Sequence, residues 1–183
     1  MVYKNKIVVE SNHKEVTFHN VTEQVKETVK RSGIKNGIVV VYSHHTTCSV
    51  ITQECAFDMS MTGRETLQQD LVDVFEKICP SYTREGIYLH PGPKALKFAE
   101  EHGEDARGCH NTEAHLISSI IGRSVTVVVD EESADLGDFG FIYFIDWDKT
   151  RGRTRTVQIM VISIKKNTRY KTRRACISYS FLY

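Results

Sequence analysis

The sequence predicts an α+β fold, a compact single domain with mainly antiparallel β-sheets and a few helices. Three strand-forming runs follow one another late in the chain, at residues 124–130, 140–146 and 156–164, and the acidic turn EESADLG joins the first two. Strands that follow strands with few intervening helices indicate antiparallel pairing. With 183 residues, 40% hydrophobic and 26% charged, the chain has the size and composition of one domain with its own core.

The first half of the chain is expected to hold a helix and then an extended segment. The helix should begin at Asn20, because Glu23 stands three residues on, as in a capping box. It should end at Gly33, since glycine tolerates a left-handed backbone. The β-branched run 37–43 is too short for a buried helix and predicts a strand, and residues 45–52 continue it in extended form.

The middle of the chain predicts a second helix over residues 62–78, where apolar residues share one face and Pro80 follows. Residues 84–93 are expected to form a short strand that runs into a turn. Residues 94–109 form a charged segment with partly helical character. A last helix should begin at Asn111 or Thr112, either of which can cap it.

Composition favours a cytoplasmic protein. No run of about 18 apolar residues exists, so no membrane span is expected. The start, MVYKNKIVVE, lacks the apolar run of a signal peptide. The five cysteines are odd in number and never spaced as CxxC, which is typical of reduced thiols and argues against a zinc knuckle or a disulfide framework.

Charge is distributed unevenly along the chain although the net charge is only +1. After Asp148 no acidic residue occurs, while ten of the 24 basic residues do, so residues 1–148 set 14 basic against 23 acidic residues, a net charge of −9. Such asymmetry suggests an anionic ligand near the C-terminal part of the chain. The alternative is a solvated basic strand and tail that balance an acidic remainder.

Two histidines are candidate site residues on sequence grounds. Asn111 and His115 are four residues apart and share a helix face beside the apolar stripe. His45 lies at the end of a predicted strand, on the same face as Thr47. Taken alone, the position of His115 favours a half-exposed helix histidine over a functional one.

Two further histidines are weaker candidates for metal binding. His102 precedes Glu104 and Asp105 and is either a loop ligand or a solvated side chain. His110 adjoins Cys109, a pair that can bind a soft metal, but no second cysteine stands at metal-ligand spacing.

Four segments together resemble the YjbQ family, some of whose members are described as secondary thiamine-phosphate synthases. They are HHTTCSVITQE, the helix that carries Asp70, HNTEAHLISSIIGRSVTVVVD and LGDFGFIYFIDWDKTRGRTR. The resemblance covers roughly residues 5–164. It implies a compact α+β fold, a homotrimer, and sites between subunits that are lined by histidines and carboxylates.

The resemblance also implies roles for individual residues. The acidic positions of the last block are Asp146 and Asp148. Arg151 and Arg153 are the expected phosphate-binding pair. The expected metal ligands are His45, His115 and Asp70, with His102 and His110 as further candidates. The expected catalytic residues are His45, His115, Glu54 and Asp70.

The chain departs from the family pattern in several places, and residues 165–183 run past the family's usual end. The usual W-Q-G after the LG turn is replaced by residues 139–141, FGF, which removes the glutamine. An extra charged segment, 94–105, precedes the histidine helix. We therefore divide the chain into a YjbQ-like domain, residues 1–164, and a basic C-terminal extension, residues 165–183.

Three functions compete. The first is a transferase that joins hydroxymethylpyrimidine diphosphate to thiazole phosphate with loss of pyrophosphate, in which arginines and a divalent metal ion, magnesium or zinc-like, neutralise phosphate charge. The second is a metal-dependent hydrolase of a phosphorylated metabolite. The third is a non-catalytic module that binds nucleic acid through the basic segment KKNTRYKTRR. The first two predict a phosphorylated small-molecule substrate.

Overall fold

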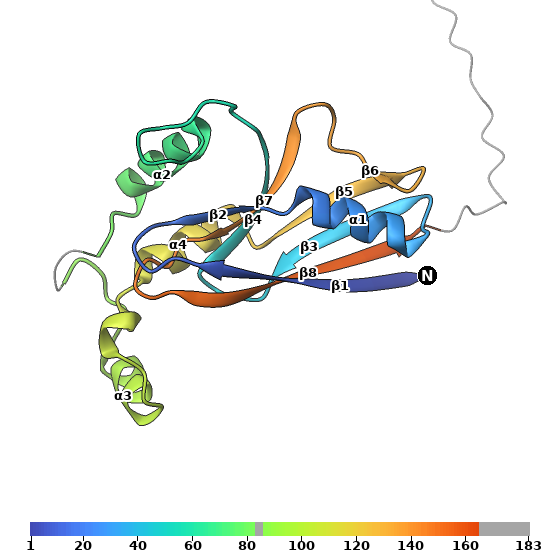
Figure 1. The fold of residues 1–183 in the computed structure, drawn as a ribbon. Coiled ribbons are helices and arrows are strands. Elements are labelled where there is room, and N and C mark those ends of the chain that lie inside the picture. Colours follow the sequence, from blue (N-terminus) through green and yellow to red (C-terminus); the bar gives the residue numbers. More distant parts are fainter. Residues whose placement is uncertain (83–85, 165–183) are drawn as a thin grey trace, which may run out of the picture.

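The computed structural model describes residues 1–82 and 86–164, which fold into two antiparallel sheets with helices around them (Figure 1). The five-stranded sheet has the order β1-β8-β3-β5-β6, and the three-stranded sheet has the order β2-β7-β4. The strands of the larger sheet are β1 (Val2–Ser11), β8 (Arg153–Ser163), β3 (Gly37–Ser43), β5 (Ser124–Asp130) and β6 (Ser133–Ala134). Those of the smaller sheet are β2 (Thr17–Asn20), β7 (Gly140–Asp146) and β4 (Cys48–Glu54).

Every strand pair is antiparallel. The fold class expected from consecutive strands is therefore confirmed. β8 pairs with β1 along its whole length and with β3 on its other side, so the C-terminal strand lies inside the larger sheet. This placement brings the start of β8, which carries the arginines, beside the end of β3.

The helices cover the sheets and extend beyond them at one end (Figure 1). They are α1 (Thr22–Ser32), α2 (Thr66–Ile78), α3 (Pro93–Glu101), the 3-10 helix η1 (Ala106–Cys109) and α4 (Thr112–Ile121). α3 and η1 project away from the sheets as an arm. We call residues 93–109 the α3 arm.

β7 is the centre of the protein, because both of its faces are covered. Ile142 and Phe144 pack into one apolar cluster with α1 and the larger sheet, while Tyr143 and Ile145 pack into a second with α2 and α4. A strand buried on both faces needs apolar residues at consecutive positions, which is why the run FIYFI does not alternate.

Several helix boundaries and one expected strand differ from the sequence predictions. α1 begins at Thr22 rather than Asn20, although the Asn20 side chain accepts a hydrogen bond from the Thr22 amide at 3.1 Å. α2 begins at Thr66, four residues later than expected. Residues 86–92 form turns rather than a strand, because the chain bends there toward α3.

The sequence predicts that the chain has no membrane span. Within residues 1–82 and 86–164, no helix combines the length and the apolar character needed to cross a membrane. The expected basic extension, residues 165–183, lies outside the described residues.

Candidate functional site

A cavity of about 490 Å³ lies where the β3–β4 loop, the start of β8, the α3 arm and the first turn of α4 meet. Its walls combine imidazole rings, guanidinium groups, one carboxylate and apolar side chains. The charged and imidazole side chains that line it are His44, His45, His90, His115, Glu104, Arg151, Arg153 and Arg155. The structure thus brings together four of the expected site residues, His45, His115, Arg151 and Arg153.

Arg155 forms the buried base of this cavity. Its Nε and Nη2 atoms donate to the two carboxylate oxygens of Asp146 at 2.6 and 3.0 Å, and Nη2 also donates to Thr47 Oγ1 at 3.0 Å. Both charged side chains are almost fully buried. Because a buried guanidinium must be paired, Arg155 is held in place by Asp146 and Thr47.

Asp148 connects α4 to the start of β8. It accepts hydrogen bonds from Asn111 Nδ2 at 2.9 Å and from the Thr150 amide at 2.9 Å, and it lies 3.4 Å from Arg153 Nη2. Burial disfavours its ionised form, but these hydrogen bonds and the Arg153 charge hold the pKa of Asp148 below its usual range. The Asn111 side chain therefore donates to Asp148. It does not cap α4, which is the role that the sequence had suggested.

Arg151 and Arg153 each present a donor without a protein partner. The Nε atoms of both side chains are buried and have no hydrogen-bond partner among the described residues. Arg151 lies against Gly108, where a Cβ atom would come within 3.2 Å of its Cζ atom. Since buried donors are normally satisfied, these two Nε–H groups are hydrogen-bonding capacity that the described residues leave unused.

His45 is a neutral side chain anchored to β8. Its Nε2 atom accepts a hydrogen bond from the Thr156 amide at 2.9 Å, so its ring proton belongs on Nδ1. Burial, followed by the charges of His44 and Arg155, lowers the pKa of His45 to about 4. At neutral pH this imidazole carries no charge.

His115 lies on α4 beside His90. The two rings meet edge to face with their centroids 5.6 Å apart. Burial and the nearby His90 lower the pKa of His115, while a hydrogen bond with the Thr46 backbone acts in the opposite direction. His45 and His115 therefore contribute neutral polar groups to the cavity, and the lining arginines contribute positive charge.

The other expected site residues lie elsewhere on the chain. Glu54 is exposed at the end of β4 and lines a separate cavity with Asp135, and Asp70 is exposed on α2. His102 stacks on Phe98 with its Nδ1 atom 2.8 Å from the Phe98 carbonyl. His110 packs against Tyr82, with tilted rings whose centroids are 4.4 Å apart. None of these four lines the cavity that holds His45 and His115.

The residues of one chain do not fit the expected metal site. A metal at His45 Nε2 would need the lone pair that accepts the Thr156 amide hydrogen. Asp70, the expected carboxylate ligand, is absent from the lining of the cavity. Within residues 1–82 and 86–164, no three histidine, cysteine or acidic side chains come close enough to share a metal ion. No chemical step is therefore assigned to a metal.

Sequence reasoning missed several side chains of the cavity. Arg155 follows Arg151 and Arg153 at the same two-residue spacing, and this alternation could have pointed to it. No sequence pattern pointed to His90 or Glu104 as site residues. Each lies in an irregular segment and lines the cavity only because of the tertiary fold.

Similar proteins share both the sequence pattern and the fold. Residues 5–163 match the family described as UPF0047 protein YjbQ-like. The chain is 26% identical over 147 residues to a UPF0047 protein of Archaeoglobus fulgidus, which covers 80% of this chain and 94% of that protein. It is also 26% identical over 141 residues to the UPF0047 protein YugU of Bacillus subtilis, which covers 77% and 87%.

Solved structures show the same fold at lower identity. A YbjQ-like protein of unknown function from Sulfolobus solfataricus superposes with a TM-score of 0.66 at 21% identity, covering 90% of this chain and 99% of that chain. A YjbQ/UPF0047 family protein from Clostridium acetobutylicum gives 0.65 at 23% identity, covering 86% and 99%. Fold and cavity define an α+β domain with an arginine- and histidine-lined pocket. The chain belongs to the YjbQ-like UPF0047 family.

Proposed function

We propose that the cavity binds the phosphate group of a small metabolite and that the protein is a phosphate-handling enzyme of the transferase class. The observation that carries this proposal is the pair of buried, unpartnered Nε–H groups of Arg151 and Arg153. Guanidinium groups suit phosphate because their planar donors match its oxygens. Asp148 holds one Nη atom of Arg153 and so orients this guanidinium group.

In the proposed reaction, a thiazole phosphate is joined to hydroxymethylpyrimidine diphosphate. The thiazole nitrogen attacks the methylene carbon, and the bond from that carbon to the diphosphate oxygen breaks, releasing pyrophosphate. Because the substrate supplies its own nucleophile, the protein needs to hold the reactants in line and to stabilise phosphate charge. The choice of reactants rests on the family resemblance, whereas the phosphate site rests on the two arginines.

The neutral histidines would serve as hydrogen-bonding groups in this reaction. His115 lies in the cavity beside His90, and burial lowers its pKa, so its neutral ring can accept or donate a hydrogen bond. His45 already uses Nε2 to accept the Thr156 amide. We therefore assign His45 to positioning the start of β8.

The proposal includes the expected homotrimer and cytoplasmic location. A site between subunits is the arrangement in which Glu54 and Asp70 of a neighbouring copy would join His45 and His115. No observation favours a metal-dependent hydrolase over the transferase. The basic segment proposed to bind nucleic acid lies outside the described residues.

Two measurements test the proposal. Inorganic phosphate is titrated into the full chain by calorimetry, and pyrophosphate release is followed with both reactants present. Arg151→Ala and Arg153→Ala should each weaken phosphate binding about tenfold or more, because each removes a charged donor. Lysine at either position should restore binding only in part, since lysine lacks the planar fork.

Arg107→Ala is the matched control. This exposed arginine pairs with Asp105 on the α3 arm and does not line the cavity. It should bind phosphate as the unsubstituted protein does. Unchanged phosphate affinity in both cavity variants would show that the two arginines do not bind phosphate. Phosphate binding without pyrophosphate release would support the phosphate site and contradict the transferase reaction.

A further inference from the structure

The α3 arm lines the cavity with side chains that differ chemically from those of residues 151–155. They are Ala95, Phe98 and Ala99 of α3 and Glu104 of the following loop. Among the described residues that line the cavity, the arm supplies no positive charge. All three lining arginines come from residues 151–155, and Arg151 contacts Glu104 and Gly108 of the arm. The arm therefore contributes apolar side chains and a single carboxylate, and residues 151–155 contribute the cationic groups.

Glu104 faces the arginine at the mouth of the cavity. Its Oε2 atom lies 2.9 Å from Arg151 Nη2. The hydrogen bond from Arg151, together with its charge, holds the pKa of Glu104 below its usual range, so this carboxylate is ionised at neutral pH. An anion that approaches Arg151 from the arm side meets this negative charge first.

Arg151 cannot present all its donors to a ligand in this arrangement. Its guanidinium packs against Gly108 on one side, and one of its Nη atoms is engaged by Glu104. Its free Nε atom is buried, as is the free Nε atom of Arg153. Arg151 and Arg153 both line the cavity, so they are the cationic groups that a phosphate bound there would meet.

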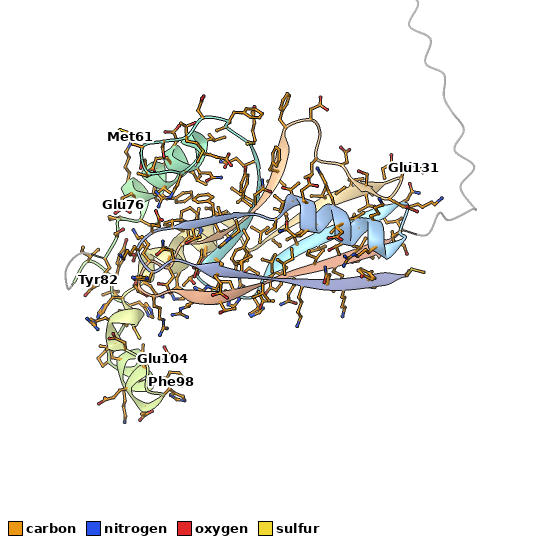
Figure 2. The ribbon with its side chains drawn as sticks, viewed as in Figure 1. Met61, Glu76, Tyr82, Phe98, Glu104 and Glu131 are labelled. Atoms are coloured by element: carbon orange, nitrogen blue, oxygen red, sulfur yellow. The ribbon has the colours of Figure 1, made fainter. Side chains whose placement is uncertain are left out.

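Phe98 provides an apolar surface at the same mouth. Its side chain is 59% exposed, and it stacks on His102 with ring centroids 3.9 Å apart. Figure 2 shows Phe98 and Glu104 labelled on the projecting arm. An exposed aromatic ring beside a phosphate site is suited to an uncharged ring of the ligand.

We infer that the α3 arm selects ligands that carry a single phosphate group attached to an uncharged apolar body. This inference rests on the proposed phosphate site. The phosphate would bind Arg151 and Arg153, and the body would lie on Ala95 and Phe98. A second phosphate would lie beside the Glu104 carboxylate with no donor from the arm. In a coupling reaction, this cavity would hold the single-phosphate reactant.

Calorimetry with three probes tests the inference on the full chain. The probes are inorganic phosphate, phenylphosphonate and pyrophosphate. The unsubstituted protein should bind phenylphosphonate more tightly than phosphate, and pyrophosphate no more tightly than phosphate. Glu104→Gln should strengthen pyrophosphate binding about tenfold, because it removes one like charge at close range, and should change phosphate binding less than about threefold. Glu104→Ala should act in the same direction.

Phe98→Ala and Glu101→Gln complete the set. Phe98→Ala should weaken phenylphosphonate binding about fivefold and leave phosphate binding unchanged, since only the apolar contact is lost. Glu101→Gln makes the same charge change on the same arm, but Glu101 pairs with Lys97 and does not line the cavity. Its affinities for all three probes should match those of the unsubstituted protein.

The outcomes separate this inference from the proposed function. An unchanged ratio of pyrophosphate to phosphate affinity in both Glu104 variants would overturn the selectivity and leave the phosphate site intact. Weaker binding of pyrophosphate in those variants would also overturn it, because Glu104 would then support binding. Absence of phosphate and phenylphosphonate binding in the unsubstituted protein would remove both proposals.

Discussion

The Nε2 atom of His45 accepts a hydrogen bond from the Thr156 amide at 2.9 Å, which ties the end of the β3 segment to β8. Through this hydrogen bond His45 stabilises the fold, a role that its place in the sequence did not indicate. His45 belongs to neither apolar cluster of the core, so its contribution to stability comes from the hydrogen bond to Thr156.

His45→Ala should lower the free energy of unfolding by about 1–2 kcal/mol, because it leaves the Thr156 amide without its acceptor. Urea unfolding followed by circular dichroism measures the change. His44→Ala is the control, because exposed His44 packs against the His45 ring and hydrogen-bonds to the Gln158 side chain but is not the acceptor of the Thr156 amide. Equal stability of the two variants would contradict an anchoring role for His45.

Acid should destabilise the protein through His45. The folded protein holds the pKa of His45 at about 4, whereas the ordinary value is 6.5, so the folded state binds fewer protons between these values. The contribution to stability is complete above about pH 6.5 and is lost as the pH falls toward 4. After allowance for solvent screening, we expect a loss of about 1–2 kcal/mol.

His45→Gln tests this pH dependence, because glutamine can accept a hydrogen bond but does not titrate. Urea unfolding of both proteins at several pH values between 4 and 7 gives the two stability curves. The variant should lose less stability than the unsubstituted protein as the pH falls. Parallel curves would show that other groups cause the acid effect.

Arg155→Met should destabilise the protein by about 3–5 kcal/mol, since it leaves the buried Asp146 carboxylate without its partner. Combining it with Asp146→Asn should recover part of that loss, because no buried charge then remains unpaired. Urea unfolding of both single variants and the double variant forms a double-mutant cycle. Strictly additive losses would argue against direct coupling of the pair.

The proposed homotrimer predicts a particle of three times the chain mass of 20.9 kDa. Light scattering at micromolar concentration measures this mass. If the trimer brings Glu54 and Asp70 to the cavity, Asp70→Asn should lower activity without changing the stability of the fold. A stable monomer would contradict the between-subunit site.

The sequence by itself determined the antiparallel α+β fold, because apolar patterning is local. The alternating residues of β3 indicate that one face of the strand is buried, and the continuous apolar run of β7 indicates that both of its faces are buried. Motifs that resemble those of the family predicted Arg151 and Arg153 as a pair and His45 and His115 as site residues.

Only the tertiary structure decided which side chains share the cavity and what state they adopt. His45 and His115 are 70 residues apart in the chain, and their meeting depends on how α4 packs beside β4. No local pattern in the sequence indicates three of the pairings. They are Glu104 with Arg151, Asn111 with Asp148, and His45 with Thr156. Such contacts depend on burial and direction, which arise when distant segments are brought to within hydrogen-bonding distance.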